Sequence, residues 1–320
     1  MKKEIGGYME LENFSGKEYY PELHKVNLGR TALLWLLESR KCKKLLVPHF
    51  LCDSVIDACK NHGVLLKFYR LDASLMPVLP DGLKDDEWLY LVNYYGQLTD
   101  DRILYFQRTY SRIIVDHTHA FFQSPLPGVD TLYSCRKFFG LSDGAYLSTD
   151  AALTTISERD YSSKRMEHIL GRYEEDAGTY YQKMLYNAST YHHMNIRRMS
   201  RLTENLLCAI DYTNVKERRE SNYHILKELL PSDHPFTTVV PAGPFAYPYY
   251  HPEGIRLRKL LAAEKIFVPT NWSNVLHDMP QDSLEYQWAA NILPLPCDQR
   301  YGKEEMQYLA DTVLRLEKNL

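Results

Sequence analysis

Apolar runs and amphipathic stretches alternate between about residues 29 and 150. Apolar residues at helical spacing indicate helices, and short continuous apolar runs bounded by turn residues indicate buried strands. The pattern predicts helices over 30–40, 52–63 and 100–110, and strands over 43–48, 64–72, 87–96, 112–117, 130–135 and 144–149. Strands that alternate with helices are joined by crossovers and therefore run parallel. The sequence predicts an α/β fold with a mostly parallel sheet flanked by helices.

Strand signals disappear between about residues 160 and 230, where polar helical patterns predict two long helices, 162–195 and 197–230. Beyond Pro231 the pattern predicts strands over 236–241 and 245–250 and helices over 252–266 and 302–318. These elements indicate a second, smaller α+β unit. We predict a large domain over residues 1–215, with an N-terminal arm and long interface helices, and a small C-terminal α+β domain over residues 216–320.

Composition excludes several classes of protein. The 320 residues carry a formal net charge of −3 and no long basic block, which argues against nucleic acid as the partner. No apolar stretch approaches the roughly 18 residues of a membrane span, and the N-terminus lacks the apolar core of a signal peptide. The six cysteines form no C-x-x-C pair, which favours a reduced, cytoplasmic protein. Because His117 and His119 alternate faces of an extended segment and no third ligand joins them, we predict no metal site.

Three polar groups fall at ends of the predicted elements that meet at one edge of the sheet. Asp116 and His119 follow one strand, and Ser134 and Lys137 follow the next. The third group is 29–31, where Gly29, Arg30 and Thr31 open a helix whose free N–H groups can hold a phosphate. Ligands bind beyond the carboxyl ends of strands in an open α/β sheet. A lysine amine, a carboxylate and an anion cradle are what pyridoxal 5'-phosphate requires.

The order of these groups resembles the fold-type I pyridoxal-phosphate enzymes, and among them the DegT/DnrJ family of sugar aminotransferases. The resemblance covers most of the chain, from about residue 27 to the segment 292–306. "GRTAL" (29–33) is similar to the family's phosphate turn, and "DHTHA" (116–120) resembles its Asp-x-Ala-His/Gln. "SCRKFFGLSDGAYL" (134–147) resembles its Schiff-base segment. "VPHFLCDSV" (47–55) and "VNYYGQ" (92–97) give supporting similarity.

The resemblance implies a role for each matching residue. Lys137 would bind the cofactor covalently and move the catalytic proton, and Asp116 would pair with the pyridine nitrogen. His119 would lie at the ring hydroxyl. An aromatic side chain stacks on the ring at the position of Cys52 in the family, and Phe50 is the nearby aromatic. The phosphate ligands would be Ser134, Arg30 and Thr31, and Asn195 would reach the cofactor of the neighbouring subunit in a homodimer.

The function implied is a pyridoxal-phosphate-dependent aminotransferase. Its substrate would be a nucleotide-linked keto-sugar, and its donor an amino acid such as glutamate. Two alternatives remain open. The chain could transfer amino groups between amino acids, or it could be a degenerate, non-catalytic homologue that binds a nucleotide-sugar, which the departures at Cys52 and Ala145 motivate.

Overall fold

The computed structural model describes residues 5–232 and 234–320, and its main feature is an eight-stranded sheet in the order β1-β8-β7-β6-β5-β2-β3-β4. The pairs β2–β3, β2–β5, β5–β6 and β6–β7 are parallel, while β1, β4 and β8 pair antiparallel. The strands are β1 (His24–Val26), β2 (Lys44–Pro48), β3 (Leu65–Leu71), β4 (Pro77–Val78), β5 (Glu87–Val92), β6 (Ile113–Asp116), β7 (Asp130–Ser134) and β8 (Ala145–Ser148). The predicted fold class, a mostly parallel sheet flanked by helices, is confirmed.

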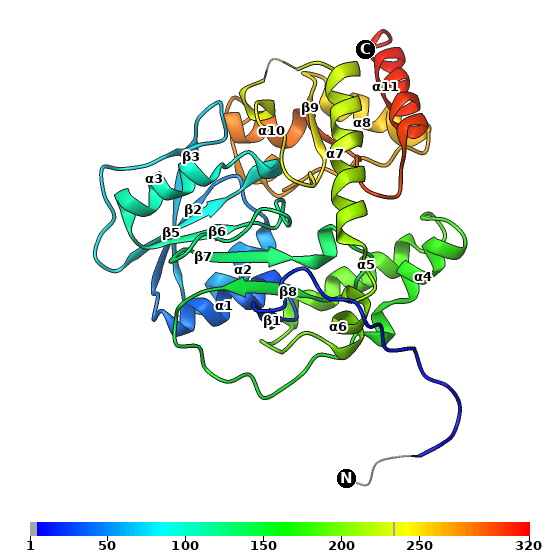
Figure 1. Cartoon of the computed structure of the whole chain (residues 1–320). Coiled ribbons are helices and arrows are strands. Elements are labelled where there is room, and N and C mark those ends of the chain that lie inside the picture. The colour runs from blue at the N-terminus through cyan, green and yellow to red at the C-terminus, as the bar shows by residue number, and fades with distance from the viewer. Residues whose placement is uncertain (1–4, 233) are drawn as a thin grey trace.

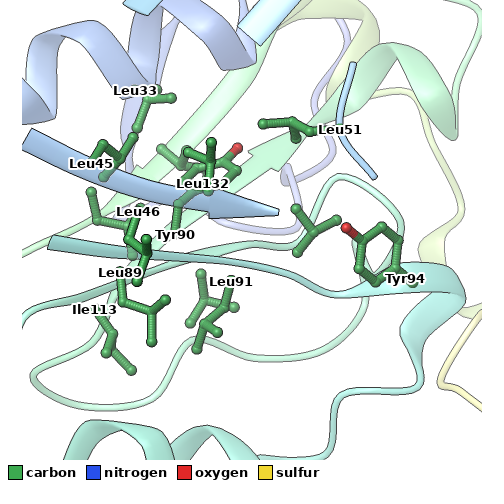
Figure 2. Packing of buried hydrophobic residues seen from close by; sticks show 14 of the residues in the cluster. Leu33, Leu45, Leu46, Leu51, Leu89, Tyr90, Leu91, Tyr94, Ile113 and Leu132 are labelled. Carbon is green, nitrogen blue, oxygen red and sulfur yellow. The ribbon is translucent and has the colours of Figure 1, made fainter. Parts of the chain in front are cut away.

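Both faces of the sheet are covered, which explains why its central strands are continuous apolar runs. The helices here are α1 (Gly29–Ser39), α2 (Asp53–Asn61) and α3 (Asp100–Tyr110), close to the predicted bounds. In Figure 2, Leu45 and Tyr90 point to the face where Leu33 of α1 lies, while Leu46 and Leu89 point to the opposite face. This alternation also directs Asp116 to the same face as Tyr90, because the two strands pair in register.

The helical region differs from its prediction. Four short helices stand in place of two long ones: α4 (Glu167–Glu174), α5 (Tyr181–Thr190), α6 (Arg201–Leu207) and α7 (Tyr212–Leu229). A turn separates α4 from α5, because the Asp176 carboxylate accepts hydrogen bonds from the backbone N–H groups of Gly178 and Thr179. Ser200 caps α6 through its side chain, so the helix starts later than the predicted residue 197. Asp211 caps α7 in the same way and makes it a separate helix.

The C-terminal part contains the antiparallel pair β9 (Tyr247–Tyr250) and β10 (Ile292–Leu295). Its helices are α8 (Gly254–Ala263), α9 (Val275–Asp278), α10 (Leu284–Asn291) and α11 (Lys303–Glu317). Figure 1 shows α11 beside α7, and both supply side chains to a second apolar cluster with β9 and β10. The domain boundary predicted between residues 215 and 216 falls within α7, and this division stays a prediction.

The strand predicted over 236–241 is wrong. The segment begins instead with a 3₁₀ turn, η5 (Pro235–Thr237). Phe236 is buried in the large apolar cluster, and the Val239 N–H donates to the Gln97 side chain. The backbone is therefore satisfied by a side chain of the large sheet region and not by a neighbouring strand. Across residues 5–232 and 234–320, no helix combines the length and the apolar character that crossing a membrane requires.

Candidate cofactor site at the carboxyl edge of the sheet

The strand order creates a crevice at the carboxyl edge of the sheet. The chain passes from β2 to β3 on one side and then returns to β5 on the other side of β2. Connections therefore diverge at the ends of β2 and β5, which is where open α/β sheets bind ligands. Cys52 follows β2, Asp116 ends β6, and Lys137 lies just after β7. The structure thus gathers three of the predicted residues at one edge.

Lys137 ends a single 3₁₀ turn, η2 (Cys135–Lys137), that follows β7 directly. The turn is fixed because the Cys135 N–H donates to the Gly144 carbonyl, whose residue has φ +114°. A Cβ at Gly144 would lie 2.9 Å from Thr203 Cγ2, so both the backbone conformation and the space require glycine there. The Lys137 side chain is exposed to a cavity, and its Nζ lies 2.8 Å from His119 Nε2.

Electrostatics around the Lys137 amine favour its neutral form. The amine faces cavity solvent, but protein surrounds it on most other sides and lowers its pKa by desolvating the charged form. The Arg136 charge lowers this pKa further, whereas Asp116 and Cys52 act in the opposite direction. A lowered pKa increases the fraction of neutral amine, and the neutral amine is the form that can attack an aldehyde or accept a proton.

Asp116 is a buried carboxylate with two fixed hydrogen bonds. Its Oδ2 accepts from the Tyr90 hydroxyl at 2.6 Å, and its Oδ1 accepts from the Thr118 N–H at 2.8 Å. The α1 N-terminus lies beside this loop, because a Cβ added to Gly29 would have Thr118 Cγ2 as its neighbour, at 3.8 Å. The arrangement fixes the carboxylate, which acts electrostatically on the Lys137 amine.

His119 is buried between aromatic rings. Its ring stacks on Phe245 with centroids 4.1 Å apart and planes at 14°, and Trp272 lies 5.3 Å away. Burial, together with the Lys137 charge, holds the pKa of His119 well below its usual value. Its Nδ1 has no hydrogen-bond partner among the described residues, so the ring keeps one free polar atom in the site.

Arg30 and Arg136, at this edge, form no ion pair among the described residues. Arg136 stacks on the Tyr191 ring, with Cζ 4.0 Å from the centroid, and its buried Nε has no hydrogen-bond partner in the described chain. Burial lowers the pKa of both Arg30 and Arg136. The Arg136 charge lowers the pKa of Arg30 further, while Cys52 and Asp53 act in the opposite direction. The two like charges therefore lie near each other, close to the N-termini of α1 and α2. Such a cluster favours an anion.

The other two predicted phosphate ligands, Thr31 and Ser134, are buried side chains, unlike the arginines. The Thr31 hydroxyl is buried, donates to Asn27 Oδ1 at 2.6 Å, and accepts from the Leu28 N–H. Ser134 is buried at the end of β7, opposite Ala145. Of these two, the hydroxyl of Thr31 is already engaged within α1 and its N-cap. The roles of Thr31 and Ser134 stay predictions.

Phe50, Cys52 and Asn195 also have identifiable positions. The Phe50 ring is fully buried and packs 4.4 Å from Trp272 and 5.3 Å from Tyr94. Cys52 is the N-cap of α2, with Sγ 3.0 Å from Ser54 Oγ. Asn195 is exposed, and its carbonyl accepts from Asn27 Nδ2 at 3.1 Å. Phe50 thus belongs to the core, while Cys52 remains partly accessible near Lys137.

A cavity of about 890 Å³ opens beside Lys137, between the large sheet and the C-terminal part. Its lining includes the basic side chains of Arg136, Lys137, Arg172, Arg219 and Arg300, of which Arg136 and Arg172 form no ion pair among the described residues. Asp298 supplies the single carboxylate among the described lining residues, and it forms an ion pair with Arg300 at 2.7 Å. Such a cavity concentrates anionic ligands.

The sequence did not single out Arg136, Phe245 or Tyr90 as site residues. Arg136 could have been found from its place next to Lys137, whereas Phe245 lies in a tyrosine-rich segment that gives no signal for a contact with His119. Within the described part of the chain, no three histidine, cysteine, aspartate or glutamate side chains gather as metal ligands would.

Comparisons with known proteins give a clear result for the fold. No protein-family model matches the chain, and no curated protein matches it by sequence. A DegT DnrJ EryC1 StrS aminotransferase from Brucella abortus aligns with a TM-score of 0.59 at 13% identity, over 92% of this chain and 85% of that chain. DesI, solved in the presence of its TDP-sugar product, aligns with a TM-score of 0.63 at 15% identity, over 92% and 79% of the two chains.

A third structure is Spr1654 from Streptococcus pneumoniae, a candidate sugar aminotransferase solved in its PLP form. It aligns with a TM-score of 0.62 at 13% identity, over 93% of this chain and 88% of that chain. The chain therefore has the fold of the DegT/DnrJ/EryC1/StrS aminotransferases, and the resemblance stated from the sequence is confirmed at the level of the fold.

Proposed function

We propose that this chain is a pyridoxal-phosphate-dependent aminotransferase that acts on a nucleotide-linked keto-sugar, with an amino acid such as glutamate as donor. The observation that carries the proposal is the Lys137 amine, which lies in a basic cavity near the buried Asp116 carboxylate. The fold likeness to DesI and Spr1654 supports the same reaction class.

The residues at this edge fit the cofactor. Arg30 and Arg136, neither of which forms an ion pair among the described residues, suit a phosphate group, and a buried carboxylate suits a protonated ring nitrogen. The free Nδ1 of His119 and the accessible Lys137 amine leave polar atoms for a ring hydroxyl and an aldehyde. Arg30 and Arg136 would hold the phosphate, Asp116 the ring nitrogen, and Lys137 the aldehyde carbon.

Pyridoxal phosphate, when bound, supplies an electron sink that stabilises the carbanion left by removal of a proton from the donor's α-carbon. The protein supplies the rest. Lys137 would accept that proton at Nζ, and desolvation favours this role because it lowers the pKa of the amine. Asp116 would hold the ring nitrogen, and its carboxylate is fixed by the Tyr90 hydroxyl and the Thr118 N–H. Phe245 and Trp272 exclude water around His119.

The cavity supports the choice of a nucleotide-linked substrate over an amino acid. Arg172 lies in its wall and is available for an anionic group, and the volume of about 890 Å³ exceeds what a free amino acid requires. A diphosphate-linked sugar carries two negative charges and a large body, which such a cavity can accommodate. Turnover of free keto acids alone would instead favour the amino-acid aminotransferase alternative.

The test is a two-stage reaction with the purified protein. Glutamate alone should convert the bound cofactor to its amino form, seen as loss of the visible absorption band, and release 2-oxoglutarate. A nucleotide-linked keto-sugar should then restore the band and appear as an amino-sugar by mass spectrometry. Lys137→Ala serves as the inactive control. A protein that binds the nucleotide-sugar but never acquires a visible band would support the non-catalytic alternative and reject the proposal.

We also propose that the chain forms a homodimer through the α4–α5 region. Exposed aromatic side chains there include Tyr173 at 91%, Tyr186 at 68% and Tyr181 at 51% exposure, and Asn195 lies close by in sequence. Burying such a surface symmetrically would suit a two-fold dimer. Asn195→Ala should weaken cofactor retention if this residue reaches the partner's site, and sedimentation analysis would measure the dimer itself.

A further inference from the structure

Arg219, in the first half of α7, is a buried cation whose hydrogen-bond acceptors are all neutral. It is 2% exposed. Its Nε donates to Gln299 Oε1 at 2.7 Å, its Nη1 to the Pro244 carbonyl at 2.8 Å, and its Nη2 to the Phe138 carbonyl at 3.1 Å. Burying a guanidinium without a bonded carboxylate is unfavourable for stability, and burial lowers the pKa of Arg219 accordingly.

The acceptors of Arg219 lie on the segments that form the candidate site. Phe138 follows Lys137 directly in the chain, and Pro244 precedes Phe245. The Phe245 ring stacks on His119, and Lys137 Nζ lies 5.4 Å from its centroid. One forked side chain thus sets the spacing between the Lys137 turn and the ring that supports His119.

Gln299 also holds the Phe138 carbonyl, because its Nε2 donates to that oxygen at 2.8 Å. The guanidinium also lies over the Phe138 ring, with Cζ 4.6 Å from the centroid. A lysine in place of Arg219 could keep the charge but could not reach three separate acceptors in one plane.

We propose that Arg219 is a positioning residue, which holds Lys137 against the His119–Phe245 stack through the backbone carbonyls of Phe138 and Pro244. This proposal rests on the proposed function only in taking Lys137 as the reacting amine. Because α7 also supplies Tyr223 and Leu226 to the C-terminal apolar cluster, Arg219 links the packing of that cluster to the placement of Lys137.

The experiment measures the reactivity of the Lys137 amine itself. The cofactor-stripped chain is treated with pyridoxal, which lacks the phosphate, trapped with borohydride, and the Lys137 peptide is quantified across a pH series. Arg219→Lys should raise the pH midpoint of labelling towards that of an ordinary lysine. The variant should also slow labelling at neutral pH by about tenfold to 100-fold, the cost of a misplaced reacting group.

Arg258→Lys is the matched control. Arg258 is an arginine of α8 that donates to the carbonyls of Ala290 and Ile292, and none of these three residues lines the cavity beside Lys137. The Arg258→Lys variant should change thermal stability without moving the pH midpoint of Lys137 labelling. If Arg219→Lys likewise lowers the melting temperature and leaves the midpoint and rate unchanged, Arg219 is purely structural and the proposal is wrong.

A second variant covers the case in which Arg219→Lys does not fold. Gln299→Ala removes the other donor to the Phe138 carbonyl and should move the midpoint in the same direction by a smaller amount; an unchanged midpoint would contradict the proposal. The two hypotheses can also fail separately. A chain that labels at Lys137 with an Arg219-dependent midpoint but gains no visible band with pyridoxal phosphate keeps the positioning role and loses the proposed function.

Discussion

Two acidic side chains at the amino edge of the parallel strands form ion pairs, whereas Arg30 and Arg136 at the carboxyl edge form none among the described residues. At the amino edge, Asp130 of β7 accepts two hydrogen bonds from Arg40, at 2.7 and 2.9 Å, and one from Thr149. Glu87 of β5 forms an ion pair with Lys67 of β3. At the carboxyl edge, Arg30 and Arg136 form no such pair, as far as the described ion pairs show, although Arg70 of β3 pairs with Glu285 there.

The difference separates charges that serve stability from charges that await a ligand. A buried ion pair with satisfied hydrogen bonds costs little net free energy, whereas unpaired like charges destabilise the folded chain. A protein keeps such charges where an anion binds, since the ligand then completes the site. The Arg30–Arg136 pair therefore has the electrostatics that favour an anion, and the Asp130–Arg40 pair those of a structural contact.

The largest expected effect is at Lys137. Lys137→Ala should abolish transamination, by at least ~10⁴-fold, because no other group can move the proton. The activity assay and the borohydride-trapped peptide measure it. Lys44→Ala is the control, since Lys44 forms its ion pair with Asp86 at the amino edge. Trapping on a different lysine would remove Lys137 from the mechanism.

Asp116→Asn should lower turnover by roughly 10²–10⁴-fold while the cofactor still binds. The neutral amide keeps the shape but no longer stabilises a proton on the ring nitrogen. Steady-state rates and the visible spectrum measure the two effects separately. Near-normal turnover in this variant would show that the negative charge of Asp116 is not used.

Arg136→Met should weaken binding of pyridoxal phosphate by about 10- to 100-fold, the loss of one charge-assisted hydrogen-bond donor. Binding of pyridoxal, which has no phosphate, should stay the same, and fluorescence titration compares the two. Arg112→Met is the matched control, because Arg112 donates to the carbonyls of Glu87 and Lys84 at the amino edge. Equal losses for both ligands would contradict a phosphate role.

Asp130→Asn tests the amino edge. It should lower the free energy of unfolding by about 1–3 kcal/mol, since the Arg40 guanidinium loses its charged acceptor. Urea denaturation measures this, and the affinity for pyridoxal phosphate should not change. A variant that keeps its stability but loses cofactor would reverse the roles assigned to the two pairs.

The smallest effect is a shift in pH dependence. The pKa of Lys137 is lowered, mainly by desolvation, so the amine loses its proton at a lower pH than an ordinary lysine. Labelling of Lys137 by pyridoxal in the cofactor-stripped chain should therefore reach its plateau at a lower pH than labelling of Lys44, whose pKa is raised by Asp86. Coincident pH profiles would show that the cavity does not desolvate the amine.

Local sequence patterns predicted most strands of the large sheet, because burial on both faces leaves strong apolar signals. They also predicted the flanking helix α3 over its full range. They did not predict the breaks in the helical region or the absence of a strand in segment 236–241. The Asp176 turn competes with the helix through side-chain hydrogen bonds, and Gln97 satisfies the Val239 backbone from far along the chain. Neither interaction leaves a periodic signal.

The sequence by itself determined that Asp116 and Lys137 follow strands, and the parallel order of those strands places their carboxyl ends at one edge. Only the tertiary structure decided that Arg136 lies near Arg30. It also decided that Phe245 stacks on His119 and that Arg219 holds the Phe138 carbonyl. The physical reason is that strand and helix periodicities are local properties of the chain. The pairing of charges, rings and carbonyls depends instead on contacts between residues about 80 to 130 positions apart, which form only when the whole chain has folded.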